Sequence, residues 1–153
     1  MDKPNCYSDV FKRYNLETYR LVCPQKIDMK KIIFTQHAPK PIGPYSQAVL
    51  AGDTLYISGQ IAIEPTGGEL VINNIEAETR QVMLNLQAVL KHAEMDFSHI
   101  VKTTIFLSSM DNFVKVNEVY GMFFSSDFPA RETVAVKTLP KNVNVEISAI
   151  AVK

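Results

Sequence analysis

Cysteine, net charge and long apolar runs are all scarce in this sequence. Its two cysteines, Cys6 and Cys23, lie near the start of the 153-residue chain. We expect free thiols in a reducing compartment, and a disulfide that closes the short loop between them is the alternative. Sixteen acidic residues balance sixteen basic ones, so no overall positive field attracts nucleic acid.

No apolar stretch approaches the ~20 residues that a membrane helix needs. The N-terminus also lacks the unbroken hydrophobic stretch of a secretory signal. We therefore expect a cytoplasmic protein without a membrane segment. Its length is that of one ordinary domain, large enough to bury a core without disulfides or metal.

Metal-ligand spacing and phosphate-binding glycine loops are missing as well. His37, His92 and His99 are scattered and have no cysteine partners at suitable intervals, so we predict no metal site. A Ser-His-Asp triad could be drawn from the available residues, but no spacing brings its members together. We expect no cofactor.

The first 28 residues differ from the rest and form a separate N-terminal extension in our reading. Apolar residues between Ser8 and Pro24 could form one face of a short helix, with imperfect periodicity. Met29 then opens a segment that looks like a domain start, so residues 29–153 form the predicted domain. The extension is either the product of an upstream start codon, without a catalytic role, or a functional segment.

From Met29 onward, turn signals and hydrophobic periodicity predict the order β-β-β-α-β-α-β-β. Asn74 should cap the first helix, which ends near Met95, and Ser109 or Asp111 should cap the second, which runs to about Phe124. The predicted strands are residues 32–35, 47–50, 54–63, 100–107, 132–138 and 144–152. This is an α+β fold, a mixed sheet of about six strands with both helices on one face.

Several predicted strands carry apolar residues on both faces. In residues 100–107, Val101, Ile105 and Leu107 should share one face, and Ile100 and Phe106 the other. Two helices can cover only one face of such a sheet, so the second face needs another cover. We therefore predict an oligomer.

Arg131 stands directly after a proline-containing turn and at the start of an alternating strand. A guanidinium held there is well suited to binding a small carboxylate. With Arg131 we group five short segments: 41–48 (PIGPYSQA), 57–61 (ISGQI), 116–120 (VNEVY), 129–131 (PAR) and 145–150 (VEISAI). From about Lys30 to Lys153, these motifs and their order closely resemble the Rid family of imine and enamine deaminases, its RidA branch in particular.

The resemblance implies a chorismate-mutase-like fold and a homotrimer, with active sites in the clefts between subunits. It also implies an activity, the hydrolysis of 2-imino acids such as 2-iminobutanoate and 2-iminopropanoate, and of their enamine tautomers. Water adds to the C=N carbon, ammonia leaves, and a 2-oxo acid remains. The protein mainly has to orient the substrate and to assist proton transfer.

Arg131 fits the role of orienting the substrate carboxylate, and an ion pair with Glu132 or Glu146 is its alternative. Glu146 is our acid/base candidate, because its strand position places it on a largely apolar face where burial would raise its pKa. It could instead only orient Arg131 or hold a subunit interface. Tyr45 could pack against the substrate or direct its hydroxyl at a water, or be an ordinary packed tyrosine.

Further substrate-binding candidates are Ser58, Gly59, Asn117 and Thr133. The missing side chain of Gly59 would let a ligand approach the backbone, unless the position is a simple bulge. Asn117 could contribute its amide to the site or cross-link subunits. Thr133 should point the same way as Arg131; several relatives carry cysteine there, so a thiol mechanism is not available at this position.

Two other functions compete with the deaminase. The first is a trimer that binds or senses small 2-oxo acids without turnover, for which Arg131 would serve equally well. The second, weaker one is ribonuclease activity or inhibition of translation, which some family members are said to have. The neutral charge balance and the lack of basic residues interleaved with aromatics argue against nucleic acid as a partner.

Overall fold

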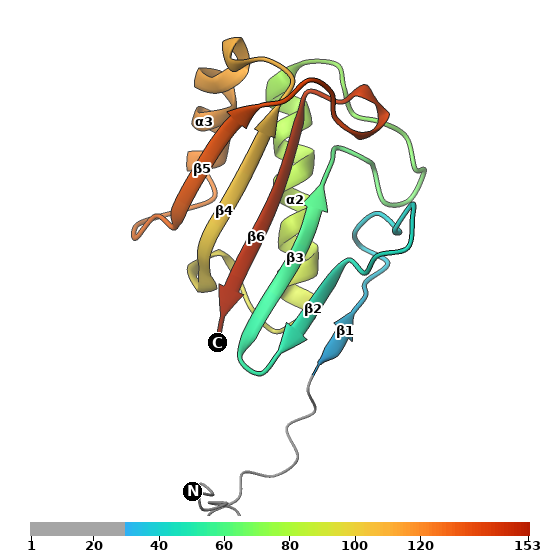
Figure 1. Cartoon of the computed structure of the whole chain (residues 1–153), viewed down its shortest axis with the longest axis vertical. Helices are drawn as coiled ribbons and strands as arrows, with labels where there is room; N and C mark the ends of the chain where they lie inside the picture. The colour runs from blue at the N-terminus through green and yellow to red at the C-terminus, as the bar shows by residue number, and fades with distance from the viewer. Residues whose placement is uncertain (1–29) are drawn as a thin grey trace, which may run out of the picture.

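The computed structural model describes residues 30–153; the predicted N-terminal extension, with Cys6 and Cys23, lies outside them. Eight main elements follow one another along the chain (Figure 1): β1 (Lys31–Ile33), β2 (Ala48–Ala51), β3 (Thr54–Gln60), α2 (Ile75–His92), β4 (Ile100–Leu107), α3 (Phe113–Gly121), β5 (Ala130–Ala135) and β6 (Val145–Val152). The predicted order is thus confirmed.

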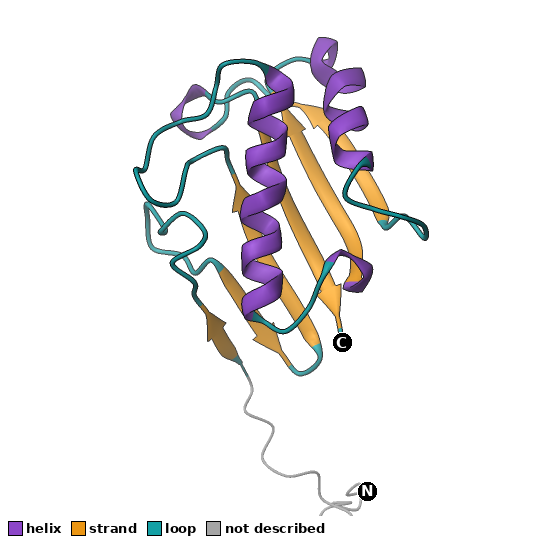
Figure 2. Ribbon diagram, turned by 180° about the vertical axis from the view of Figure 1, so that it is seen from behind, coloured by secondary structure: helices purple, strands orange, loops and turns teal. Residues whose placement is uncertain are grey.

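The six strands form one mixed sheet in the order β1-β2-β3-β6-β4-β5. All neighbours are antiparallel except β4 and β5, which run parallel because α3 crosses between them. Both helices lie on the same face of the sheet (Figures 1 and 2). The α+β architecture with two helices on one face is as predicted, and the other face has no cover within residues 30–153.

Helix α2 forms the centre of the core. Asn74 caps it by accepting a hydrogen bond from the Ala77 N–H at 2.7 Å. The helix has an apolar stripe that includes Val82, Leu86 and Val89, all fully buried against the sheet. This packing, more than helix propensity, stabilises the helix. Within residues 30–153, no helix is long and apolar enough to cross a membrane.

Helix α3 is shorter than predicted at both ends. Ser109 caps a 3₁₀ turn over Met110–Asn112, and the α-helix begins only at Phe113. At the other end, the N–H groups of Phe123 and Phe124 bond to carbonyls three residues back. These are tighter turns of the kind that close a helix.

Strand ends also differ from the prediction, because pairing partners decide where a strand stops. β5 spans residues 130–135 rather than 132–138, since its parallel partner β4 ends at Leu107, which lies opposite Ala135. β3 ends at Gln60 instead of residue 63, after a bulge opposite β6.

A second bulge corrects our assignment of faces in β4. The register between β4 and β6 shifts between Ile100 and Lys102, which breaks the simple alternation of side chains. Ile100 is therefore buried with Ile105 and Leu107 under the helices, while Val101 is 48% exposed. The uncovered face still carries large apolar side chains, among them Tyr56 and Val134, each about half exposed.

Candidate active site

Arg131 lies on β5 with its guanidinium directed at helix α3. Its Nη1 donates a hydrogen bond of 2.6 Å to Oδ1 of Asn117. The guanidinium carbon lies 5.2 Å from the ring centre of Tyr120 and 5.8 Å from that of Phe113, within the range of cation–π attraction. Arg131 and Asn117, predicted separately, are thus in direct contact.

Next to Arg131 is a cavity of about 280 Å³, lined also by Asn117, Tyr120, Gly121, Phe128 and Pro129. Tyr120 forms its inner wall: its hydroxyl bonds to Oγ1 of Thr103 at 2.9 Å, and burial raises its pKa. The lining thus combines aromatic surface with one fixed positive charge, which suits a small molecule that carries a carboxylate.

The ion pair that we left open for Arg131 is not formed. Glu132 bonds instead to Lys102, with Nζ 2.7 Å from Oε1, because Glu132 points to the opposite face of the sheet. Among residues 30–153, Arg131 has no acidic side chain within 4 Å. Its charge is therefore available to a ligand.

Thr133 follows two positions later, opposite Ile105 of β4. Its hydroxyl oxygen is buried and has no hydrogen-bond partner within the described residues. A buried hydroxyl without a partner is costly. Thr133 does not line the cavity beside Arg131, and its contact with a substrate stays a prediction.

Glu146 and Gly59 face each other on neighbouring strands. A Cβ built on Gly59 would come within 2.7 Å of Glu146 Cδ, so only glycine leaves room for this carboxylate. The space that we predicted for a ligand beside Gly59 is thus occupied by Glu146. Burial alone raises the pKa of Glu146, as predicted, and no hydrogen bond or charge within residues 30–153 opposes this rise.

Tyr45 and Ser58 lie close to this pair. Tyr45 is 47% exposed, and its hydroxyl accepts a hydrogen bond from the N–H of Ile42. Tyr45 and Gly59 line the same small cavity. Ser58 donates its hydroxyl to the carbonyl of Ser46 at 2.7 Å, so this hydroxyl holds the loop rather than pointing freely at a ligand.

The loop before β2 presents Tyr45 but buries Gln47. Gln47 is 2% exposed, and its amide bonds to the N–H and carbonyl of Thr35 and to the carbonyls of Ala38 and Pro39. These four bonds fix the turn after β1 and explain why that strand stops before Thr35.

The predicted residues therefore form two groups, Arg131 with Asn117, and Glu146 with Gly59, Ser58 and Tyr45. Arg131 is opposite Thr103, whereas Glu146 is opposite Phe106. Successive side chains of a strand point to opposite faces, so Arg131 points to the helix side and Glu146 to the open side. One chain does not bring the two together, and Glu146 cannot orient Arg131 within it.

Comparison with known proteins decides the family. Residues 35–153 match the family described as Endoribonuclease L-PSP. The chain is 50% identical over 125 residues to a RutC family protein of Pyrococcus horikoshii, covering 82% of this chain and 99% of that one. It is 45% identical over 125 residues to the human 2-iminobutanoate/2-iminopropanoate deaminase, covering 82% and 91%.

The chain belongs to the Endoribonuclease L-PSP family. The resemblance to Rid proteins is thereby confirmed. Among solved structures, Escherichia coli TdcF with bound serine has the same fold with a TM-score of 0.78 and 40% identity, covering 80% of this chain and 98% of that one.

In this member of the L-PSP family, sequence reasoning missed a buried acid that supports the site. Glu78 of α2 is fully buried, although an acid in the first turn of a helix is ordinarily explained by the helix dipole alone. Its carboxylate accepts hydrogen bonds from the N–H and side-chain amide of Asn144 and from the N–H of Val145. It thus anchors the start of β6 immediately before Glu146.

Sequence reasoning also missed Phe128, which is 66% exposed and lines the cavity beside Arg131. Its place in the same turn, three residues before Arg131, was the available signal. Within residues 30–153, no three His, Cys, Asp or Glu side chains gather as a metal site would require.

Proposed function

We propose that this protein hydrolyses 2-imino acids, such as 2-iminobutanoate and 2-iminopropanoate, and their enamine tautomers to 2-oxo acids and ammonia. The observation that carries the proposal is Arg131 beside a small aromatic-walled cavity, without an acidic partner in residues 30–153. The name of the human relative and the serine bound to TdcF both support a small substrate with a carboxylate.

In the proposed reaction, Arg131 binds the substrate carboxylate through two parallel hydrogen bonds. A water oxygen forms a bond to the C=N carbon, and the nitrogen gains a proton. The hydroxyl of the resulting carbinolamine then passes its proton to the nitrogen, the C–N bond breaks, ammonia leaves with the electron pair, and the C=O bond of the 2-oxo acid forms. Glu146 positions the water and accepts and returns its proton, a role suited to a carboxyl with a raised pKa.

We further propose that a homotrimer completes the site in the cytoplasm. Arg131 and Glu146 lie on opposite faces of one sheet, so a neighbouring subunit has to bring the second group to the first. The uncovered face, with Tyr56 and Val134 half exposed, supports burial against another copy. No nucleic acid, membrane or cofactor is part of the proposal.

The activity is tested by coupling the protein to an amino-acid oxidase and following the disappearance of the imine. Wild type should accelerate hydrolysis, Arg131→Ala should lose nearly all of the acceleration, and Glu146→Gln most of it. Binding of a 2-oxo acid without any acceleration would indicate a sensor, and an Arg131→Ala variant as fast as wild type would overturn the role of Arg131.

The shared site is tested by complementation. Arg131→Ala and Glu146→Gln chains are unfolded, mixed in equal amounts and refolded together. If Arg131 of one subunit works with Glu146 of a neighbour, random trimers should recover about one quarter of the sites, since half of the chains retain each group. No recovery would place both groups of a site in one chain. Sedimentation of the wild type checks the number of subunits.

A further inference from the structure

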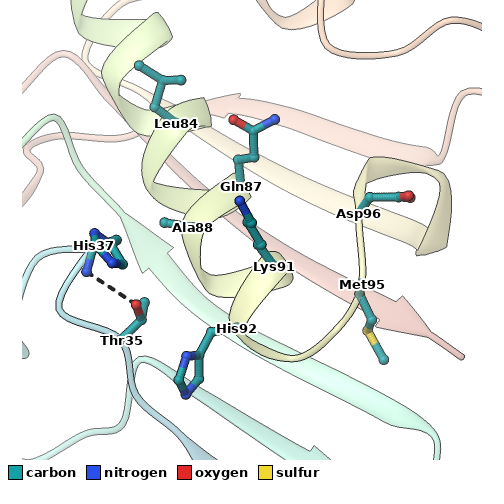
Figure 3. Close-up of a pocket in the computed structure, with 9 residues that line it drawn as sticks. All are labelled: Thr35, His37, Leu84, Gln87, Ala88, Lys91, His92, Met95 and Asp96. Atoms are coloured by element: carbon teal, nitrogen blue, oxygen red, sulfur yellow. Dashed lines mark hydrogen bonds between the residues drawn. The ribbon is translucent and has the colours of Figure 1, made fainter.

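A groove unrelated to the candidate active site lies between α2 and the turn that follows β1 (Figure 3). It encloses about 720 Å³, within the range of small-molecule sites. It shares no residue with the cavity beside Arg131. A ligand of this groove would therefore be independent of the proposed substrate.

Three nitrogen-bearing side chains border the groove. Lys91 and His92 come from the last turn of α2, and His37 from the turn after β1. Within residues 30–153, none of the three side chains forms an ion pair or a hydrogen bond; the bond between His37 and Oγ1 of Thr35 comes from the backbone N–H of His37. The edge of the groove thus offers donors that are not satisfied by the protein.

The one acid in the lining is already engaged. Oδ1 of Asp96 accepts hydrogen bonds from the N–H and hydroxyl of Ser98, at 2.8 and 2.5 Å, and lies 3.0 Å from Nδ1 of His99. These bonds lower the pKa of Asp96 and direct its charge to its own turn. The remaining lining is neutral or basic, which favours an anion.

The backbone on both sides of His37 is held in place before any ligand arrives. The buried amide of Gln47 holds the turn through Thr35 and Ala38 on either side of His37. A donor on a rigid support loses less entropy on binding than one on a free loop. The turn therefore has the properties of a built recognition element.

Apolar groups line the rest of the groove. Ala88 faces the turn that carries His37, Leu84 lies one turn before it on α2 and is 44% exposed, and Met95 is buried. A ligand with a short hydrocarbon body would cover Leu84 and Ala88, while its charged end meets the nitrogen atoms at the edge.

We propose that this groove binds a small amphiphilic anion, a phosphate ester or carboxylate whose charged group lies at the edge that Lys91, His92 and His37 border and whose apolar body packs on Ala88 and Leu84. Either head group offers acceptor oxygens for the same donors.

The test uses the full chain with ¹³C-labelled alanine and methionine methyl groups. Hexyl phosphate, hexanoate and hexanol are titrated while the signals of Ala88 and Met95 are followed by NMR. Saturable shifts with either anion, at affinities at least about tenfold above that of hexanol, support the proposal, and the stronger of the two identifies the head group. Equal binding of hexanol, or no saturable shift with either anion, overturns it.

Charge variants complete the test. Lys91→Gln should weaken anion binding about tenfold, since a charge-assisted hydrogen bond is lost. Lys141→Gln, which removes the same charge from an exposed turn elsewhere, should bind as wild type. Unchanged binding in Lys91→Gln would overturn the proposal. Arg131→Ala should lose imine hydrolysis but bind the anions as wild type does. The two measurements therefore distinguish a failure of the groove proposal from a failure of the proposed enzyme activity.

Discussion

Gly59 leaves the space that the carboxylate of Glu146 occupies on the neighbouring strand. A methyl group at position 59 would overlap this carboxylate, and the Glu146 side chain would have to rotate away. Because a long side chain moves more cheaply than backbone, the cost should fall on the site and not on the fold. A glycine can thus be required by a catalytic candidate rather than by a turn.

We therefore predict that Gly59→Ala lowers imine hydrolysis at least about tenfold, because the acid/base group is misplaced, while the unfolding temperature changes little. Steady-state kinetics and thermal unfolding measure the two effects. Gly67→Ala is the control, because it adds the same methyl group in the exposed turn that ends before Leu70. There the added Cβ would lie 3.4 Å from the nearest atom, Oε2 of Glu64. Full activity of Gly59→Ala would show that the position of Glu146 is unimportant.

Much of this arrangement could be predicted from sequence, and the reason for each success is local. Asn74 and the apolar stripe of α2 act within one helix, and the side-chain face of Glu146 follows from its position on β6. Bulges were not predictable, because they depend on the partner strand; the shift opposite β6 reversed the position of Val101.

The partner of Gly59 was hidden for a similar reason. Residues 59 and 146 are far apart in sequence, and nothing in either segment indicates that their strands are neighbours. The separation of Arg131 from Glu146 depends on the same strand order. Strand position and family resemblance together supplied both residues as candidates, but only the register of the sheet shows that they face opposite sides.

Titration of Glu146 should be visible in stability. Burial raises the pKa of this carboxyl above its ordinary 4.5, so the folded protein favours the protonated form. This stabilisation is complete at pH values below the pKa of Glu146 in the unfolded chain. It is lost as the pH rises through the pKa of Glu146 in the folded protein. Glu146→Gln keeps a neutral group at every pH. Its unfolding temperature should therefore equal that of wild type near pH 4 and exceed it near pH 7.

Thermal unfolding at several pH values and one protein concentration measures this difference. Glu132→Gln is the matched control, because hydrogen bonding and charge from Lys102 lower the pKa of Glu132. In that variant the sign should reverse, with any loss of stability present at neutral pH and absent in acid. A Glu146→Gln variant with no pH-dependent advantage would argue that Glu146 is solvated in the assembled protein.

Asn117 should act on substrate binding through Arg131. Its Oδ1 accepts the 2.6 Å hydrogen bond that holds the guanidinium against α3. Without it, Arg131 must be ordered by the substrate itself, which costs affinity. We predict that Asn117→Ala raises KM about tenfold with a small change in kcat. Glu118→Ala, on the exposed side of the same helix turn, should leave both constants unchanged; a fall in kcat alone in Asn117→Ala would indicate direct catalysis.

Glu78 should contribute more to stability than its exposed neighbour. Glu78→Ala leaves the N–H groups of Asn144 and Val145 without partners at a buried position, which should cost about 3 kcal/mol of unfolding free energy. Glu76→Ala removes a largely exposed pair with Lys115 at 3.3 Å, which solvent screens, and should cost clearly less than Glu78→Ala. Urea unfolding at one protein concentration compares the two, and equal losses would contradict the anchoring role of Glu78.

The residue that follows the C-terminal cap of α2 offers a gain in stability. Glu94 has a φ of 59°, a left-handed conformation that glycine adopts without strain and that costs other residues energy. Its pair with Lys153 is long, at 3.8 Å, and exposed, so little is lost with it. Glycine also gives the unfolded chain more conformational entropy, which offsets part of the gain. We predict that Glu94→Gly raises the free energy of unfolding by a net amount of about 0.5–1 kcal/mol. Glu94→Ala, which also removes the pair but keeps a Cβ, should give no gain. If both variants changed stability equally, charge rather than backbone conformation would be the cause.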